Sequence, residues 1–151
     1  MLSQIPLLAE MAKTVSISIS GNDAASSKLA DRLHEAVASQ FLAHTHHRLV
    51  PDPARADAIL IASITNYTSR PVILDPDTPR PGTVDINITL RIIITERKTG
   101  KVLFDDPNFE VRERYQFGAG EGNDTFLLYT ARYAAGVIVG EILEDSRWMR
   151  D

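Results

Sequence analysis

Alternation of apolar and polar residues predicts the strands of this protein. Val15, Ile17 and Ile19 alternate with serines, a period of two that is typical of a half-buried strand. The stretch 58–68 begins apolar on both faces, which favours a central position in a sheet. The most regular alternation lies within residues 83–117, where one face holds Val84, Ile86, Ile88, Leu90, Ile92 and Ile94. The pattern predicts a strand over 13–20, a second over 58–68, and a two-stranded ribbon over 83–117.

The ribbon turns once, at "ERKTGK", and its second strand is the less regular one. Gly100 can adopt the positive φ that a hairpin loop with a bulge requires. Pro107 has no N–H to donate, so "DDPN" is expected to interrupt the pairing. Glu113 falls on the otherwise apolar side of the strand, which indicates a bulge or an edge position.

Two other stretches repeat apolar residues with the period of a helix. The first stripe consists of Leu29, Leu33, Val37 and Phe41. The second stripe consists of Leu127, Ala131, Ala134, Ile138 and Ile142. We expect Ser26 or Ser27 to cap the first helix, which should end near His44, and Asp124 or Thr125 to cap the second.

The order strand, helix, strand, strand, strand, helix predicts an α+β fold. We expect two helices packed on one face of a roughly four-stranded mixed sheet with a long β-hairpin, the other face being left to solvent or a partner. Residues 69–82 contain four prolines and are expected to form an excursion between strands. The whole chain, 1–151, should be a single domain with an N-terminal extension (1–12) and a polar tail (144–151).

Composition narrows the range of functions. A chain of 151 residues suffices for one core. The net charge of −4 argues against a general nucleic-acid binder, which would be basic. The absence of cysteine excludes disulfides, thiolate zinc sites and cysteine nucleophiles within the chain. No apolar run approaches the roughly 18 residues needed to span a bilayer.

Few residues suggest catalysis or metal binding. His44, His46 and His47 form a cluster, but no further ligand stands at a suitable spacing, so imidazoles near a helix C-terminus are the favoured interpretation. Asp75 and Asp77 are too few for a calcium loop, and "GAGEG" lacks the residues of a phosphate-binding loop. No serine occupies a nucleophile elbow. We expect no catalytic residues, no metal and no cofactor.

Basic residues gather on the polar side of the ribbon and beside its turn. They are Arg91, Arg112, Arg114 and Lys101. Arginine presents a planar fork that suits phosphate groups. A charged, solvated sheet face interspersed with Asp85 and Glu110 is the simpler interpretation, and both remain open at this point.

Several stretches, in this order, resemble the LPS-assembly lipoprotein LptE family in its divergent, non-enterobacterial form. They are "KTVSISI", "LADRLHEAVASQF", "HRLVPDPARADAILIASITNYTSRPVILDPDT", "VDINITLRIIITERKTGKVLFDDPNFEVRERYQF" and "ARYAAGVIVGEILE". Together they cover nearly the whole chain.

The resemblance implies a non-catalytic subunit of lipopolysaccharide assembly. Members of the family are lipid-anchored at the periplasmic face of the outer membrane, plug the barrel of LptD, the lipopolysaccharide translocon, and are reported to bind lipopolysaccharide. The acylated cysteine of the family is not in this chain, so the membrane anchor is expected to precede Met1. Arg91, Arg112, Arg114 and Lys101 become candidate lipopolysaccharide contacts on strand phase alone.

Two other functions fit the same pattern. The basic side of the ribbon is compatible with a stand-alone periplasmic binder of lipopolysaccharide or another glycolipid. The arrangement of strands and helices is compatible with an activator lipoprotein of a cell-wall synthase.

Overall fold

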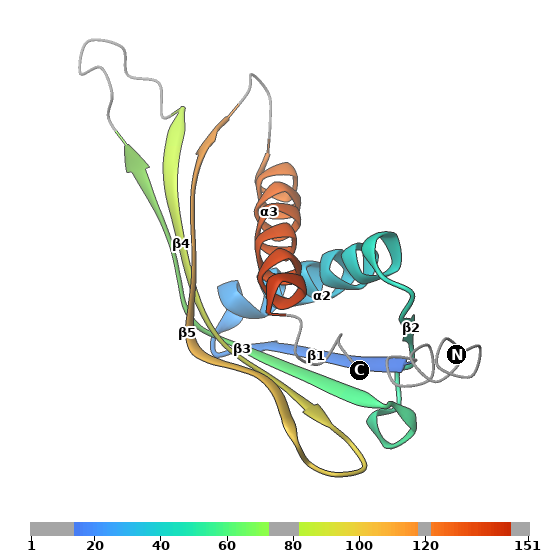
Figure 1. The fold of residues 1–151 in the computed structure, drawn as a ribbon. Helices are drawn as coiled ribbons and strands as arrows, with labels where there is room; N and C mark the ends of the chain where they lie inside the picture. Colours follow the sequence, from blue (N-terminus) through green and yellow to red (C-terminus); the bar gives the residue numbers. More distant parts are fainter. Residues whose placement is uncertain (1–13, 73–81, 118–121, 146–151) are drawn as a thin grey trace.

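The computed structural model describes residues 14–72, 82–117 and 122–145, and Figure 1 shows their arrangement. The long elements follow the order expected from the sequence. The elements are β1 (Thr14–Gly21), α2 (Ala24–His44), β2 (Arg48–Leu49), the short 3-10 helix η1 (Pro53–Arg55), β3 (Ala58–Val72), β4 (Thr83–Glu96), β5 (Val102–Gln116) and α3 (Asn123–Glu144). The predicted N-terminal extension and almost all of the polar tail lie outside the described residues, as do Asp75 and Asp77.

The strands form one five-stranded mixed sheet in the order β2-β1-β3-β4-β5. β1 runs parallel to β2 and to β3, while β3–β4 and β4–β5 are antiparallel. The α+β class and the mixed sheet are confirmed, and the sheet has five strands where roughly four were expected. The extra strand is β2, whose two residues are too few to show any periodicity in the sequence.

β3 is longer than the sequence suggested, because it continues to Val72 and includes Pro71. Beyond Gly21, which pairs with Ile64, β1 has ended, so the remainder of β3 has a neighbour on the β4 side only. Proline is tolerated on a strand whose N–H faces an open edge. Residues 69–72, which were expected in the excursion, therefore belong to β3; residues 73–81 of the expected excursion lie outside the described residues.

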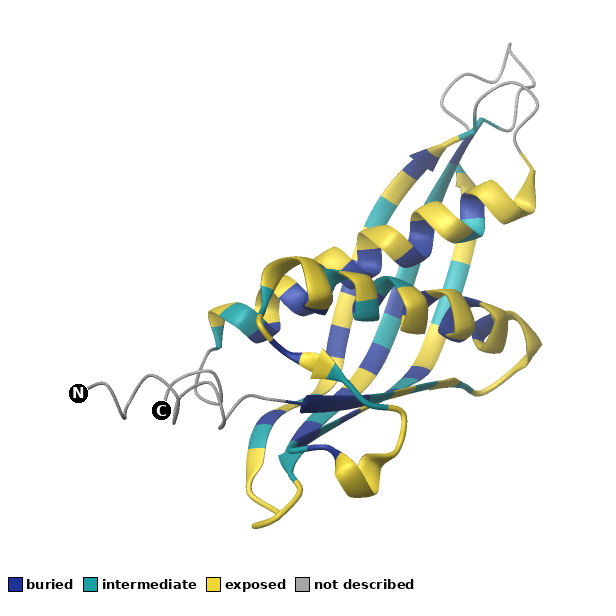
Figure 2. Ribbon diagram, turned by 90° about the vertical axis from the view of Figure 1, so that its right-hand side faces the viewer, coloured by how far each residue is buried: buried dark blue, intermediate teal, exposed yellow. Residues whose placement is uncertain are grey.

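Both helices cover the same face of the sheet, and the core lies between these two layers. Figure 2 shows buried residues alternating along the strands and following the inner sides of the helices. On β4 the residues from Ile86 to Ile94 at every second position are at most 1% exposed. The helices bury Leu29, Leu33, Val37 and Phe41 from α2, and Phe126, Ala131, Ala134, Ala135, Ile138, Val139 and Ile142 from α3. The predicted phase of β4 is thus confirmed, as are most positions of the helical stripes.

The helix starts differ from the expectation. Asp23 caps α2, accepting a hydrogen bond from Ser26 N–H (2.8 Å), while the Ser26 hydroxyl bonds back to Asp23 N–H (3.0 Å). Ser26 is therefore the third helical residue of a reciprocal capping box. α3 begins after Gly122 without a side-chain cap, although Asp124 and Thr125 stand close by. None of the four residues expected to cap a helix is the capping residue. Ser26 and Ser27 lie within α2, and Asp124 and Thr125 lie within α3.

The β4–β5 hairpin has the predicted turn. Gly100 has a φ of 72°, which a residue with a Cβ rarely adopts. Pro107 does not end β5; it lies in a bulge, since Leu90 pairs with Phe109 and Ile92 pairs with Asp106. Glu113 shows no bulge but lies on β5, the outer strand of the sheet, so the edge alternative for this residue is confirmed.

α3 is long and apolar enough to cross a membrane by length and composition alone, which corrects the expectation that no such stretch exists. In the fold, its residues from Phe126 to Ile142 on one side are buried against the rest of the molecule. The apolar character of α3 is accounted for by the core that it helps to form.

Glycine substitutions test the packing of the two layers. A Cβ on Gly21 would overlap the backbone of Ser26 and Ser27, whereas a Cβ on Gly136 or Gly140 would meet nothing within 4 Å. We expect Gly21→Ala to lower the free energy of unfolding by about 1–3 kcal/mol, and Gly136→Ala or Gly140→Ala to raise it by about 0.4–1 kcal/mol. Urea unfolding monitored by circular dichroism measures each change. A loss of stability in the α3 variants would contradict the open surface around these two glycines.

Candidate functional site

The face of the sheet that points away from the helices carries an ordered set of polar side chains. On β3, β4 and β5 the outward residues pair across the strands in three consecutive rows. The rows are Asn66, Thr89 and Glu110; then Thr68, Asn87 and Arg112; then Arg70, Asp85 and Arg114. Because side chains in paired positions lie on one side of a sheet, these nine residues form one surface, here called the polar face.

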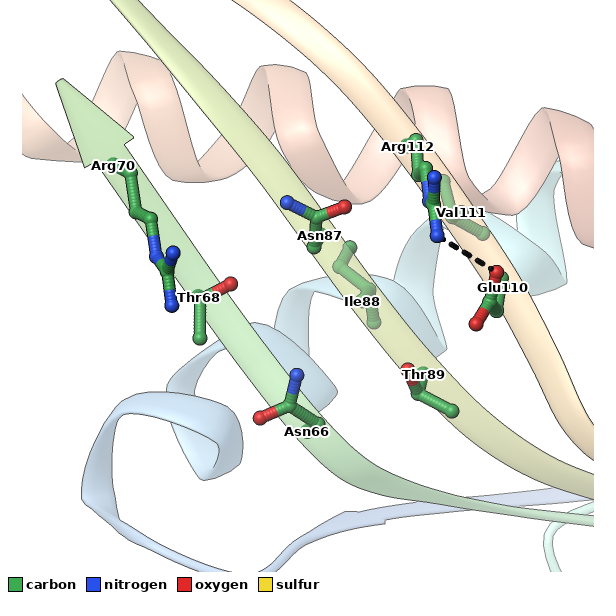
Figure 3. Close-up of a pocket in the computed structure, with 9 residues that line it drawn as sticks. All are labelled: Asn66, Thr68, Arg70, Asn87, Ile88, Thr89, Glu110, Val111 and Arg112. Carbon is green, nitrogen blue, oxygen red and sulfur yellow. Dashed lines mark hydrogen bonds and ion pairs between the residues drawn. The ribbon is translucent and has the colours of Figure 1, made fainter. Parts of the chain in front are cut away.

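The polar face is hollowed into a trough of about 350 Å³. Figure 3 shows Arg70 on β3 and Arg112 on β5 at opposite sides of the trough, with Asn87 between them on β4 and helices behind the strands. The other polar residues of its lining are Asn66, Thr68, Thr89 and Glu110. This volume lies at the lower end of the roughly 300–1,000 Å³ of small-molecule sites.

Two bulges at the same level lie next to one end of the trough. On β3 the register shifts at Thr65, between Ile64 and Asn66, and on β5 it shifts at the Pro107 bulge. Both shifts are next to Leu90 of β4. Bulges bend strands and increase their twist, and Figure 1 shows the three strands changing direction in their middle. The trough belongs to the limb of the sheet that carries the start of β4 and the end of β5.

The charges of the polar face are only partly paired. Arg114 Nε donates to Asp85 Oδ1 at 2.8 Å, and this hydrogen bond holds the pKa of Asp85 below its usual range. Arg112 lies 3.3 Å from Glu110, but both side chains are more than half exposed, so this pair is weak. No described carboxylate forms an ion pair with Arg70 or Arg91. The face therefore has positive charge available to an incoming anion.

The chemistry of the trough suits binding. Guanidinium forks donate N–H groups to phosphate or carboxylate oxygens, while amide and hydroxyl side chains form hydrogen bonds with hydroxyl-rich groups. The residues that line it are Asn, Thr, Arg and Glu, with Ile88 and Val111, and they include no histidine. A phosphorylated or hydroxylated ligand matches these groups better than an apolar one does.

The structure brings together three of the four basic residues singled out in the sequence. Arg112 lines the trough, Arg114 lies in the next row, and Arg91 is exposed on β4 beside the bulge. Lys101 lies at the hairpin turn, where its carbonyl accepts from Glu96 N–H. From Asn87, which pairs with Arg112, to Glu96 is about 30 Å along β4, so Lys101 cannot share a small ligand with the trough.

Sequence reasoning missed the β3 side of the site. Asn66, Thr68 and Arg70 lie at alternate positions, and this spacing is visible in the sequence. Because four prolines occur in residues 69–82, Arg70 was assigned to a loop, and the strand was predicted to end at Thr68. The missed signal was a period of two that continues past Tyr67.

The histidine cluster does not assemble a site. His47 is buried and its ring packs edge-on against Phe41, with 5.9 Å between ring centroids, whereas His44 and His46 are exposed. Within residues 14–72, 82–117 and 122–145 no three histidine or acidic side chains are placed to hold a metal ion. Burial, with a smaller contribution from His46, lowers the pKa of His47. His47 is therefore a core residue that favours its neutral form.

Comparison with protein families gives one match that covers most of the chain. The family model described as LptE, lipopolysaccharide-assembly, matches residues 12–142. The family expected from the sequence is thus confirmed. No protein with a curated description matches the chain significantly.

Solved structures share the fold at low sequence identity. A hypothetical protein from Chlamydia trachomatis is 11% identical, with a TM-score of 0.56, and the match covers 92% of this chain and 99% of that one. Rare lipoprotein B from Shewanella oneidensis is 12% identical, with a TM-score of 0.52 and coverage of 87% and 94%. A putative lipoprotein from Caulobacter crescentus is 16% identical, with a TM-score of 0.52 and coverage of 95% of each chain. At these identities the similarity establishes the fold.

Burial of His47 predicts a pH-dependent stability. Its pKa in the folded state lies below that of the unfolded chain, about 6.5. The contribution of the buried neutral ring to the free energy of unfolding is fully present above that value. It is lost as the pH falls towards the folded pKa, by at most about 1.4 kcal/mol per pH unit. We expect His47→Leu to flatten this dependence in urea unfolding between pH 7.5 and 5, and the matched control His46→Leu to retain it. Identical pH profiles for the wild type and His47→Leu would contradict the assignment.

Proposed function

This chain belongs to the LptE family, and from that premise we propose that it is a non-catalytic subunit of lipopolysaccharide assembly that plugs and stabilises an LptD-type β-barrel. The family match over residues 12–142 is the observation that carries the proposal. We further propose that the protein acts at the periplasmic face of the outer membrane. Its lipid anchor would be attached to a cysteine outside these 151 residues, which contain none.

The architecture supports this function. Two helices cover one face of the sheet, so the chain presents a stiff body in which the β4–β5 hairpin is anchored to a core. The other face of the sheet is polar over three rows of paired residues. The interior of a large transmembrane barrel is polar as well. A plug of such a lumen needs a polar, complementary surface and no catalytic group.

The trough supports a direct contact between this protein and lipopolysaccharide. Binding of lipopolysaccharide by the protein alone, without a barrel, is the second candidate function. Arg112 and Arg70 flank the trough, and Arg91 adds positive charge beyond it on β4, whereas the charge of Arg114 is offset by Asp85. Phosphate groups on a glycolipid would meet guanidinium forks here, and sugar hydroxyls would meet Asn87 and its neighbours. Lys101 would contribute only through a ligand long enough to reach the hairpin turn.

Co-purification tests the barrel assignment. The lipidated full-length protein, tagged at its C-terminus and produced with its cognate barrel, should be recovered with that barrel from detergent-extracted outer membranes. Depletion of the protein should lower the amount of folded barrel, measured by heat-modifiable migration on gels. Normal barrel folding after depletion, with no co-purification, would count decisively against the plug.

Charge reversal tests the lipid contact separately. We expect the double variant Arg70→Glu with Arg112→Glu to bind lipopolysaccharide at least about tenfold more weakly, because two charge-assisted contacts are lost. The control Arg32→Glu with Arg132→Glu makes the same change on exposed positions of α2 and α3. Binding should also weaken with salt, since exposed charges are screened over about 10 Å at 0.1 M. Equal affinity of both double variants would contradict a contact at the trough.

A further inference from the structure

The first strand has an open edge over most of its length. β2 pairs only with Thr14 and Val15, and Val50 N–H ends this pairing by donating to Val15 C=O at 3.1 Å. Backbone N–H and C=O groups of a strand face alternate sides, so those of Ile17 and Ile19 point to the same side as those of Val15. Among the described residues, no strand pairs with β1 on this side beyond Val15.

Burial along β1 changes where β2 ends. Thr14, Val15 and the next residue are buried, whereas Ile17 and Ile19 are only half-buried. Both isoleucines pack against the core from the helix side of the sheet. Their remaining exposure therefore comes from the missing neighbour at the edge. Thr14 and Val15, which pair with β2, are buried, and this shows the effect of a neighbouring strand on this edge.

An apolar pocket of about 260 Å³ lies beside this edge, on the helix side of the sheet. Its lining includes Ile17 from β1, His34 and Ala38 from α2, and Leu49 and Pro51 from the segment around β2. The pocket is smaller than the roughly 300–1,000 Å³ of small-molecule sites. It has room for one large apolar side chain that enters from a strand lying along β1.

The His34 ring already uses one of the hydrogen-bonding groups of the edge. Its Nε2 lies 3.1 Å from Ile17 C=O, a hydrogen bond in the tautomer that carries its proton on Nε2. The contact with an exposed side chain shows that a donor can reach the Ile17 carbonyl oxygen from outside the sheet. The N–H of an added strand would take the place of this exposed imidazole.

The opposite edge of the sheet differs in every respect that governs strand pairing. β5 carries the Pro107 bulge, and its outer half bears Glu110, Arg112 and Arg114. Bulges, prolines and charges are the devices by which proteins prevent pairing at an edge. The open part of β1 is "SISISG", with no charge, no proline and no bulge in its pairing with β3. Of these two edges, as far as the described residues show them, β5 has such devices and the open part of β1 has none.

We propose that the open edge of β1 accepts an extended, uncharged segment of a partner protein as an added strand, with one apolar side chain in the adjoining pocket. Backbone hydrogen bonds to Ile17 and Ile19 supply affinity, and the pocket supplies selectivity, as in other complexes formed by strand addition. This site is separate from the polar face and does not depend on the proposed barrel or lipid contacts.

A second copy of the chain fits the edge less well than a free segment does. The open residues lie between β2, on the same edge, and the start of α2 after Gly21. Antiparallel pairing of two β1 strands around Ile19 would bring the Val15 of each copy opposite Asp23 of the other. Each β2 would then meet the capping turn of the other copy's α2. A single extended segment of about five residues avoids this conflict.

Peptide binding tests the proposal. The probes are seven-residue peptides of alternating threonine and apolar residues, labelled with a fluorophore, in which the central residue is alanine, valine, leucine or phenylalanine. We expect saturable binding to the full chain that is stronger for leucine than for alanine, with slower hydrogen exchange at the Ile17 and Ile19 amides. N-methylation of the peptide bonds that face β1 should abolish binding, and methylation of the alternate bonds should not. Failure of every peptide to bind at millimolar concentration would overturn the proposal.

Variants separate the edge from the pocket. Ile19→Pro removes an N–H that faces the open edge and should weaken binding about fivefold or more, the value of one hydrogen bond. Ala38→Leu fills the pocket and should remove the preference for peptides with a large central residue. This variant still tests the proposal if the proline variant fails to fold. The control Ala43→Leu makes the same change at an exposed position of α2 outside the pocket. Loss of selectivity in both leucine variants would contradict the assigned pocket.

His34→Ala and protein concentration complete the test. Without the imidazole, the Ile17 carbonyl loses its competing donor, so peptide affinity should rise severalfold; an unchanged or lower affinity would argue against strand addition at this carbonyl. Protection of the Ile17 and Ile19 amides that increases with protein concentration in the absence of peptide would show a second copy at the edge, and would overturn the proposed occupant.

Discussion

The structure depends on burial of one face of β4 by the two helices. From Ile86 to Ile94, every second residue of this strand is at most 1% exposed, and each such side chain contributes about 1.5–3 kcal/mol of hydrophobic free energy. Successive residues of a strand point to opposite faces, so the residues between these buried positions must face outwards. A shift of the strand by one position would exchange the two faces. Covering one side with α2 and α3 therefore fixes which residues face outwards, and it makes the polar face a consequence of the core.

The bulges at Thr65 and Pro107 give this sheet its bent shape. Both lie beside Leu90, so β3 and β5 are displaced relative to β4 at one level and the three strands bend together. On one side of the bend, arginine, amide and hydroxyl groups from three strands line a trough. The same sheet is protected by proline and charge along β5 but open along β1. The polar face and the open edge of β1 are separate surfaces held by a single core.

Sequence patterns predicted what depends on local periodicity. The phase of β4, the glycine turn and the two helical stripes follow from residues close together in the chain, and the family follows from their order. The pairing partners do not, because register is set by bulges between distant segments. Arg70 was therefore assigned to a loop, and β2, with two residues, left no periodic signal. At Asp23 both residues of a capping box carry suitable oxygens, so composition alone could not decide which one precedes the helix.

Photocrosslinking in cells tests the central claim, that this protein fills the lumen of a barrel, most directly. A benzophenone amino acid would replace Thr68 on the polar face, Lys98 at the hairpin turn, or Arg132 on the exposed side of α3, in three separate strains. A body enclosed by a barrel is in contact with it on several sides, so the account predicts crosslinks to one outer-membrane barrel from all three positions. Crosslinks from a single position, or from none, would contradict it.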